Sequence, residues 1–192
     1  MQMLTYKPIQ ANRQQFVKFW SHRYDDVQED LYINNIGREL TEQRIFDLYQ
    51  WKNGTPLSAS KQAAVQQNFI DRRNAMESLP NNYSAHDFLA RFDTGGAIWR
   101  IFWLHCCQLD RFPIYDQHVH RAMAFIQAGA DEEISQYDRK KIDTCICRYL
   151  PFHATFSDID GRRVDKALWA FGKFIKPIRS RFPTTIARPE TR

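Results

Sequence analysis

The sequence contains few glycines, only 7 in 192 residues, and no stretch approaching about 20 consecutive apolar residues. Scarce glycine argues against a β-rich fold, because such folds rely on many tight turns. The missing apolar run argues against a membrane-spanning helix. Residues 1–11 also have no apolar segment long enough for a signal peptide. We therefore expect a protein with no membrane partner.

The four cysteines do not follow the C-x-x-C spacing of zinc sites or thioredoxin-like motifs. Cys106 and Cys107 are adjacent, and one residue separates Cys145 from Cys147. All four lie in apolar stretches, where reduced cysteine behaves as a small hydrophobic side chain. The sequence therefore predicts no metal and no cofactor, and it favours a cytoplasmic location with reduced thiols.

Acidic residues are scarce at the end of the chain. Residues 161–192 contain nine Lys or Arg and two acids, within a protein of net charge +5. Such an excess favours a polyanionic partner, and DNA is the expected nucleic acid. The alternative is a solvated surface that binds nothing. The candidate phosphate contacts here are Arg162, Arg163, Lys166, Lys173 and Lys176.

What the chain has in quantity is aromatic residues, 27 in all, and apolar residues at helical spacing. The pattern predicts an all-α fold, a compact orthogonal helical bundle. It occupies residues 1–177, as one domain or as two lobes meeting near 80–95, and a loose basic tail follows at 178–192. The expected helices are 11–24, 41–53, 58–78, 84–92, 97–107, 117–127, 131–149 and 159–175, with 31–40 ambiguous.

Local signals support several helix ends. Thr41 is a suitable N-cap, and Gly54 follows the same helix as a C-cap. Ser84 and Asp87 resemble a capping box. The 97–107 helix is apolar on nearly every side, which predicts that it lies at the centre of the core.

The segment Phe112–Ala122, with sequence FPIYDQHVHRA, contains the strongest candidate for chemistry. Pro113 stiffens the approach to a helix, and Asp116 stands at the positive end of that helix. A carboxylate held there stays ionised, so in an open cleft it can stabilise a cation or activate water. The alternative is that Asp116 is an ordinary helix cap.

This segment resembles the part of the helix-hairpin-helix DNA glycosylase superfamily that contains the catalytic aspartate. Phe-Pro-Ile before the aspartate is similar to the adenine glycosylases, and Asp-x-His after it is similar to endonuclease III. The preceding apolar helix and the later segment Val164–Gly172 fit the same pattern. The resemblance covers roughly residues 85–176 and implies a glycosylase-like fold.

The resemblance also implies roles for individual residues. Asp116 is then the catalytic carboxylate, which stabilises the sugar cation as the bond to a flipped-out base breaks. Candidate contacts with that base are Tyr115, Trp99 and His118. Thr94, Gly95 and Gly96 stand where the family has its phosphate-binding hairpin, and Arg121 is a further candidate for a phosphate.

The chain departs from the family in three places. The hairpin glycines Gly95 and Gly96 are adjacent rather than alternating, and Asp93 beside them repels phosphate. No lysine lies between Lys61 and Asp116, which excludes a Schiff base from the family's lysine position. No cysteine follows Trp169, so no iron–sulfur cluster is expected.

These features lead to one main hypothesis and two rivals. The first is a monofunctional base-excision DNA glycosylase, a hydrolase of DNA repair. The second is a non-catalytic relative with the same fold, which binds nucleic acid or a protein. The third is an unrelated helical interaction protein whose motif is accidental.

Overall fold

The computed structural model describes residues 12–80, 82–129 and 132–181, and the expected all-α fold is confirmed for them. The described part contains helices and turns and no strand. The glycosylase-like arrangement stays a prediction. None of the described helices combines the length and the apolar character that crossing a membrane requires.

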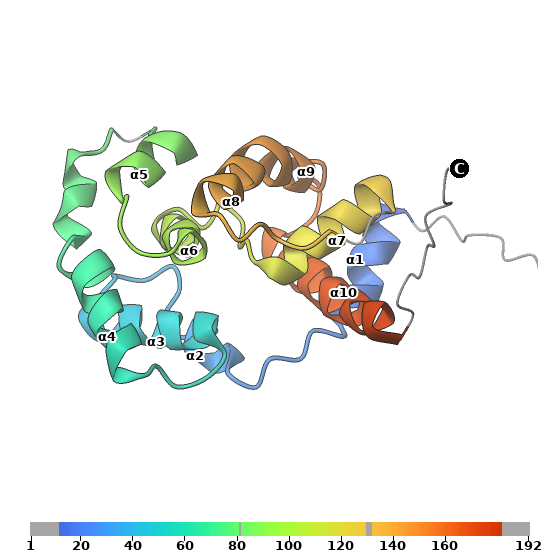
Figure 1. Ribbon diagram of the computed structural model, residues 1–192, viewed down its shortest axis with the longest axis horizontal. Coiled ribbons are helices and arrows are strands. Elements are labelled where there is room, and N and C mark those ends of the chain that lie inside the picture. The colour runs from blue at the N-terminus through green and yellow to red at the C-terminus, as the bar shows by residue number, and fades with distance from the viewer. Residues whose placement is uncertain (1–11, 81, 130–131, 182–192) are drawn as a thin grey trace, which may run out of the picture.

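The helices form three groups around a shared core (Figure 1). Helices α2 (Glu29–Ile33), α3 (Glu42–Asn53) and α4 (Ala59–Val65) lie together below α5 (Ala85–Arg91) and α6 (Ala97–Cys107). At the opposite end, α10 (Gly161–Arg181) packs against both α1 (Arg13–Ser21) and α7 (Gln117–Ala128). Helices α8 (Asp138–Thr144) and α9 (Leu150–Ala154) lie between the two ends.

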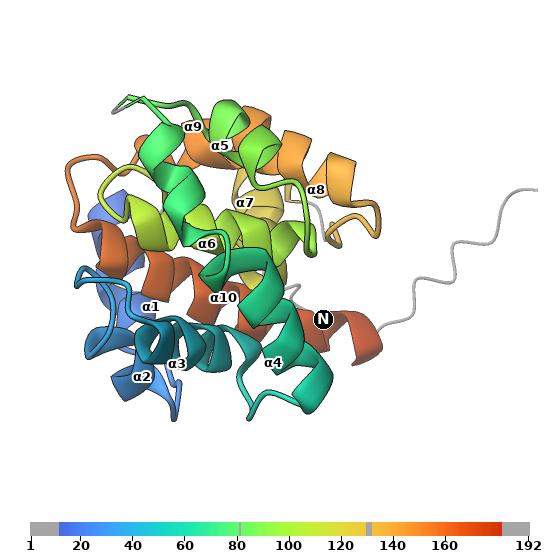
Figure 2. The same cartoon turned by 90° about the vertical axis from the view of Figure 1, so that its left-hand side faces the viewer.

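Helix α6 lies among the other helices, as its apolar sequence predicts (Figure 2). Phe102 and Trp103 are fully buried. The buried aromatic ring of Tyr49 on α3 lies near both of them. One continuous hydrophobic core therefore includes side chains from α1 through to α10.

The predicted caps of α3 and α5 are confirmed, and a glycine also ends α7. Thr41 caps α3, and Gly54 ends it with a positive φ of 73°. Ser84 and Asp87 exchange both hydrogen bonds of a capping box at α5. Gly129 ends α7 with φ 62°.

The prediction of a single helix over residues 58–78 is wrong. The chain forms α4, then η1 (Gln66–Ile70) with wider π-type turns, then the 3₁₀ helix η2 (Arg73–Ser78). The side-chain amide of Asn68 donates to the Ala64 carbonyl, the group that a regular helix would pair with the Asn68 N–H. The wider turn leaves both Phe69 and Ile70 buried.

The helix expected over 131–149 begins only at Asp138, and residue 131 lies outside the described residues. Glu132 and Glu133 instead reach Arg148 and Arg121, which holds the segment before α8 as an ion-paired connection. The chain then continues through η3 (Cys145–Tyr149) into α9, so the expected stop before Pro151 is also wrong. Pro151 fits because it lies in the first turn of α9.

Helix α10 runs to Arg181, six residues beyond the expected end at Ile175. Pro177 does not stop it, so the first residues of the predicted tail are helical. The remainder of that tail, residues 182–192, lies outside the described residues.

His105 of α6 is the basis of a pH prediction. Its Nδ1 lies 2.6 Å from the Phe112 carbonyl oxygen, and its Nε2 lies 2.8 Å from the Tyr32 hydroxyl. A carbonyl only accepts, so Nδ1 carries the proton in the neutral ring and Nε2 accepts from Tyr32. Burial lowers the pKa of His105 to about 4.

Because the folded-state pKa lies below the unfolded value of about 6.5, His105 stabilises the fold fully above pH 6.5. Its contribution of about 3 kcal/mol should be lost as the pH falls from 6.5 to 4. Urea unfolding across this range measures it. His105→Phe should flatten the dependence, and His86→Phe on the exposed surface should not. An unchanged slope in His105→Phe would contradict this assignment.

Candidate functional site

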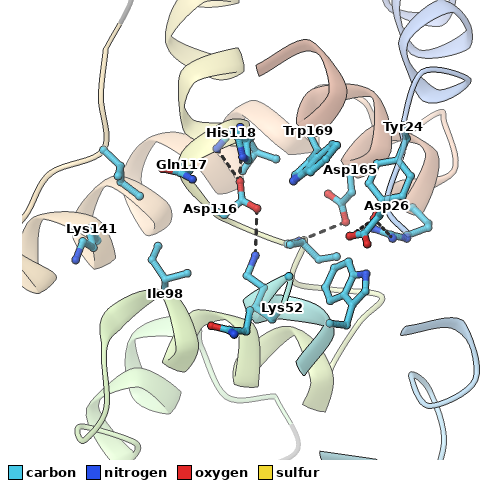
Figure 3. Close-up of a pocket in the computed structure, with 17 residues that line it drawn as sticks. Tyr24, Asp26, Lys52, Ile98, Asp116, Gln117, His118, Lys141, Asp165 and Trp169 are labelled. Carbon is cyan, nitrogen blue, oxygen red and sulfur yellow. Dashed lines mark hydrogen bonds and ion pairs between the residues drawn. The ribbon is translucent and has the colours of Figure 1, made fainter. Parts of the chain in front are cut away.

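A cavity of about 460 Å³ opens where α3, α6, α7 and α10 approach one another (Figure 3). Asp116 and Lys52 lie at its centre and face each other, as the dashed line between them shows. Tyr24 and Asp26 lie on one side of this pair, and Ile98 and Lys141 lie on the other. The site therefore draws on segments that are far apart in the sequence.

Asp116 is held by the first turn of α7, as its helix-cap position predicts. Its Oδ1 accepts the backbone N–H groups of His118, at 2.8 Å, and Val119, at 3.1 Å. Its Oδ2 lies 3.2 Å from Nζ of Lys52. The side chain is 16% exposed, so the carboxylate is recessed in the cavity wall without being sealed from water.

The carboxyl of Asp116 is stabilised in its charged form. Burial raises the pKa of this group, but the Lys52 charge and the His118 and Val119 N–H groups outweigh that effect. The net pKa lies below the usual aspartate range, so Asp116 is ionised at neutral pH. An ionised carboxylate at the N-terminal end of a helix is a suitable partner for a positive charge that develops during a reaction.

Lys52 is the site residue that sequence reasoning missed. It stands in the last turn of α3, one residue before Asn53 and the Gly54 cap, and its side chain is only 5% exposed. The end of this helix at Gly54 was expected, and Trp51 beside Lys52 is 6% exposed. Nothing in the sequence pairs Lys52 with a residue 64 positions later, because only the fold brings the end of α3 within reach of the start of α7.

Aromatic rings and a second ion-pair group form the wall beside Trp169 and Tyr24. The ring centroids of these two residues are 5.1 Å apart. Arg162 stacks over Tyr32, with 4.2 Å between its guanidinium carbon and the ring centroid. It also binds Glu29 at 2.7 Å, so this cation is already neutralised.

Of the predicted base contacts, only His118 lines the cavity. Tyr115 is fully buried behind it, with its hydroxyl 2.9 Å from Nδ1 of His120. Trp99 packs on Tyr49, and its neighbour Ile98 faces the cavity instead. The aromatic lining comes from Tyr24, Trp51 and Trp169, which sequence reasoning did not select as base contacts.

The predicted hairpin residues Thr94, Gly95 and Gly96 form an exposed turn between α5 and α6, outside the cavity. The Thr94 hydroxyl accepts from Arg72, which also lies 3.4 Å from Asp93. The acid that was expected to repel phosphate therefore has a cation beside it.

Burial contradicts the predicted phosphate contact of Arg121. This side chain is 1% exposed and binds Glu133 at 3.1 Å and the Gly172 carbonyl at 2.8 Å. It joins α7 to α10 and cannot reach a ligand outside. Lys166 is only part-exposed and shares Glu29 with Arg162.

The other predicted cations, Arg163, Lys173 and Lys176, are exposed. Nζ of Lys173 lies 4.6 Å from the Trp169 ring centroid. Burial lowers the pKa of His118, and the nearby Lys176 charge contributes to that shift. Lys173 therefore lies beside a residue of the cavity wall, and Lys176 is close enough for its charge to act on another, although neither lysine nor Arg163 lines the cavity itself.

No known protein family, curated protein or solved structure matches this chain. The glycosylase resemblance therefore rests on the residues themselves. Within the described residues, no group of three His, Cys, Asp or Glu side chains is arranged to hold a metal ion.

Proposed function

We propose that this protein is a monofunctional DNA glycosylase that hydrolyses the bond between a flipped-out base and its sugar. The observation that supports this proposal is an ionised carboxylate, Asp116, in the wall of an open cavity of about 460 Å³. Small-molecule sites commonly have volumes of about 300–1,000 Å³, so the cavity is large enough for a base.

The chemistry follows from the charge that develops at the sugar. As the base departs, C1′ and the ring oxygen share a positive charge, and an anion beside them lowers the barrier. The helix N–H groups fix the position of Asp116 before the reaction begins, so little reorganisation is needed. Trp169 lines the cavity and is partly exposed, so it is the candidate against which an unstacked base can rest.

Three exposed lysines beside the cavity, Lys61, Lys173 and Lys176, support the choice of DNA as partner, and we call them the rim lysines. Lys61 donates to Asn53, which lines the cavity. Lys173 lies near the Trp169 ring, and the charge of Lys176 acts on His118. None of the three forms an ion pair with an acid within the described residues, so their charges are available to phosphates.

The double variant Lys173→Glu/Lys176→Glu should weaken DNA binding. If each lysine contacts one phosphate, the plot of log affinity against log salt should become shallower by about 2. Fluorescence anisotropy at several salt concentrations measures this slope. Lys18→Glu/Arg38→Glu makes the same change in net charge at exposed residues outside the cavity, and should leave the slope nearly unaltered. Equal slopes in both double variants would contradict the phosphate role of the rim lysines.

One observation favours a second candidate, a non-catalytic DNA-binding module. Both oxygens of Asp116 already have partners, two N–H groups and an ammonium, as a purely structural cap would. A strand-cleavage assay with alkali work-up, across damaged and mismatched duplexes, separates the two. Base release supports the glycosylase, whereas binding without release supports the module. For either role we propose a cytosolic location, since all four cysteines are free thiols.

A further inference from the structure

The ammonium of Lys52 faces the reaction space beside Asp116. Its Nζ lies 3.2 Å from Oδ2 of Asp116 and 3.4 Å from the Tyr115 carbonyl oxygen. The side chain extends from the end of α3 across the cavity, as Figure 3 shows. Two groups of opposite charge are therefore held side by side in one hollow.

The other cations that line the cavity are already committed. Lys141 binds Asp138 at 2.8 Å, and Arg162 is fixed by Glu29 and by the surrounding aromatic rings. Lys52, in contrast, is paired with Asp116 in the described residues. The proposed reaction requires that same carboxylate to stabilise the sugar cation. As positive charge develops at the sugar, the fixed Asp116 carboxylate is shared between that charge and Lys52, which leaves Lys52 with donor capacity beside the cavity.

We propose that Lys52 is a second catalytic residue, which donates a proton to the departing base, and that the site is specialised for neutral bases. This inference rests on the proposed glycosylase function. A neutral base leaves with the electron pair of the broken bond and develops negative charge, which an ammonium neutralises. A base that is already cationic, such as an N7-alkylated purine, leaves as a neutral molecule and needs no donor.

The proton balance closes within the pair. The C1′–N bond breaks, its electron pair goes to the base, and a proton moves from Nζ to the base. Water then adds to C1′ and gives its proton to Oδ2 of Asp116. That proton returns to the Lys52 amine across the 3.2 Å contact. Water is consumed, the free base and an abasic sugar are produced, and both residues recover their starting charge.

The same contact favours a proton donor over an amine nucleophile. Nζ of Lys52 forms an ion pair with Oδ2 of Asp116 at 3.2 Å, so it takes part in the site as an ammonium. An ammonium has no free electron pair with which to attack C1′. Lys52 therefore differs in role from a Schiff-base lysine, and no covalent protein–DNA intermediate is expected.

The test compares single-turnover base release from two sets of otherwise identical duplexes. One set contains a neutral base, uracil or hypoxanthine, and the other contains cationic N7-methylguanine. Lys52→Met should slow the release of neutral bases by about 10²-fold or more and that of N7-methylguanine by only a few-fold. Asp116→Asn should slow both. Lys52→Arg keeps the charge but does not give up a proton at neutral pH, so it should leave the neutral-base rate low.

Lys141→Met is the matched control, since it removes another cation from the same cavity. It should change both sets by the same factor. Thermal unfolding of each variant confirms that the rates come from folded protein.

Each other outcome has a distinct meaning. An equal loss on both sets in Lys52→Met would show that Lys52 only positions Asp116, and would overturn the inference. So would wild-type activity confined to N7-methylguanine, although base release would still support the proposed function. Trapping of a covalent complex by borohydride would overturn the inference and would show a glycosylase that is not monofunctional. Wild-type protein that releases no base from any duplex would overturn the proposed function, and this inference with it.

Discussion

Asp116→Asn should reduce base release by about 10³-fold or more while the fold survives. Asparagine caps helices about as well as aspartate, so the N–H groups of His118 and Val119 keep an oxygen acceptor. The lost quantity is the negative charge, which is the property that stabilises a sugar cation. Single-turnover release from the best duplex in the panel measures the effect.

Loss of the charge also leaves Lys52 without its anion. Removing one partner from a fully sealed ion pair costs about 3–5 kcal/mol. The cavity is open to water, so we expect a smaller loss of about 1–3 kcal/mol, and rates should be measured well below the melting temperature. DNA affinity should change little, because the rim lysines are unaltered.

Asp26→Asn is the matched control, since it neutralises another carboxylate of the cavity wall. This residue lies beside Tyr24, away from the Lys52–Asp116 pair. Base release should fall less than 10-fold. If Asp116→Asn released base at the wild-type rate, Asp116 would be reduced to a helix cap.

The helices that the sequence predicted correctly are those whose ends are set by short-range chemistry. Thr41 and Gly54 around α3 act through neighbours within four residues, as do Ser84 and Asp87 at α5. The misplaced start of α8 depends on residues further away in the sequence. The segment before α8 is fixed by ion pairs of Glu132 and Glu133 with Arg148 and Arg121, and no local rule contains those pairs.

The site residues also divide into one that a local sequence pattern identifies and others that depend on the fold. Asp116 could be selected because proline, an apolar anchor and an acid before a helix form a local pattern. Lys52, Trp51 and Trp169 could not, since they reach the same cavity as Asp116 only through the positions of α3 and α10 in the fold. A count of basic residues also misleads, because Arg121, Arg162 and Lys166 bind glutamates and only part of the basic segment remains available.

The second large effect is expected at Gly172, where α10 crosses α7. A Cβ at this position would lie 1.9 Å from the backbone oxygen of His118 and 2.6 Å from its carbonyl carbon. The atoms in the way belong to the backbone of His118, so no side-chain rotation can relieve the clash. The two helices must therefore move apart. Gly172→Ala should therefore destabilise the protein by about 3 kcal/mol. That corresponds to roughly 6–12 °C in melting temperature for a chain of this size.

Gly172→Ala should also reduce base release, because the contact lies directly beside the site. The His118 backbone that would clash also donates its N–H to Oδ1 of Asp116. Arg121 binds the Gly172 carbonyl oxygen at 2.8 Å, so separating the helices breaks that bond as well. A displaced first turn of α7 would move the carboxylate relative to Lys52, and small displacements at a reacting centre can lower rates about 10²-fold.

Gly161→Ala on the same helix is the control, because a Cβ there meets no atom within 4 Å. Its stability should stay within about 0.5 kcal/mol of wild type. Calorimetry and base-release rates for both variants test the two effects separately. A Gly172→Ala protein with wild-type melting temperature would show that α7 and α10 are not in backbone contact. A destabilised but fully active one would show that the Asp116 cap does not depend on the spacing of these helices.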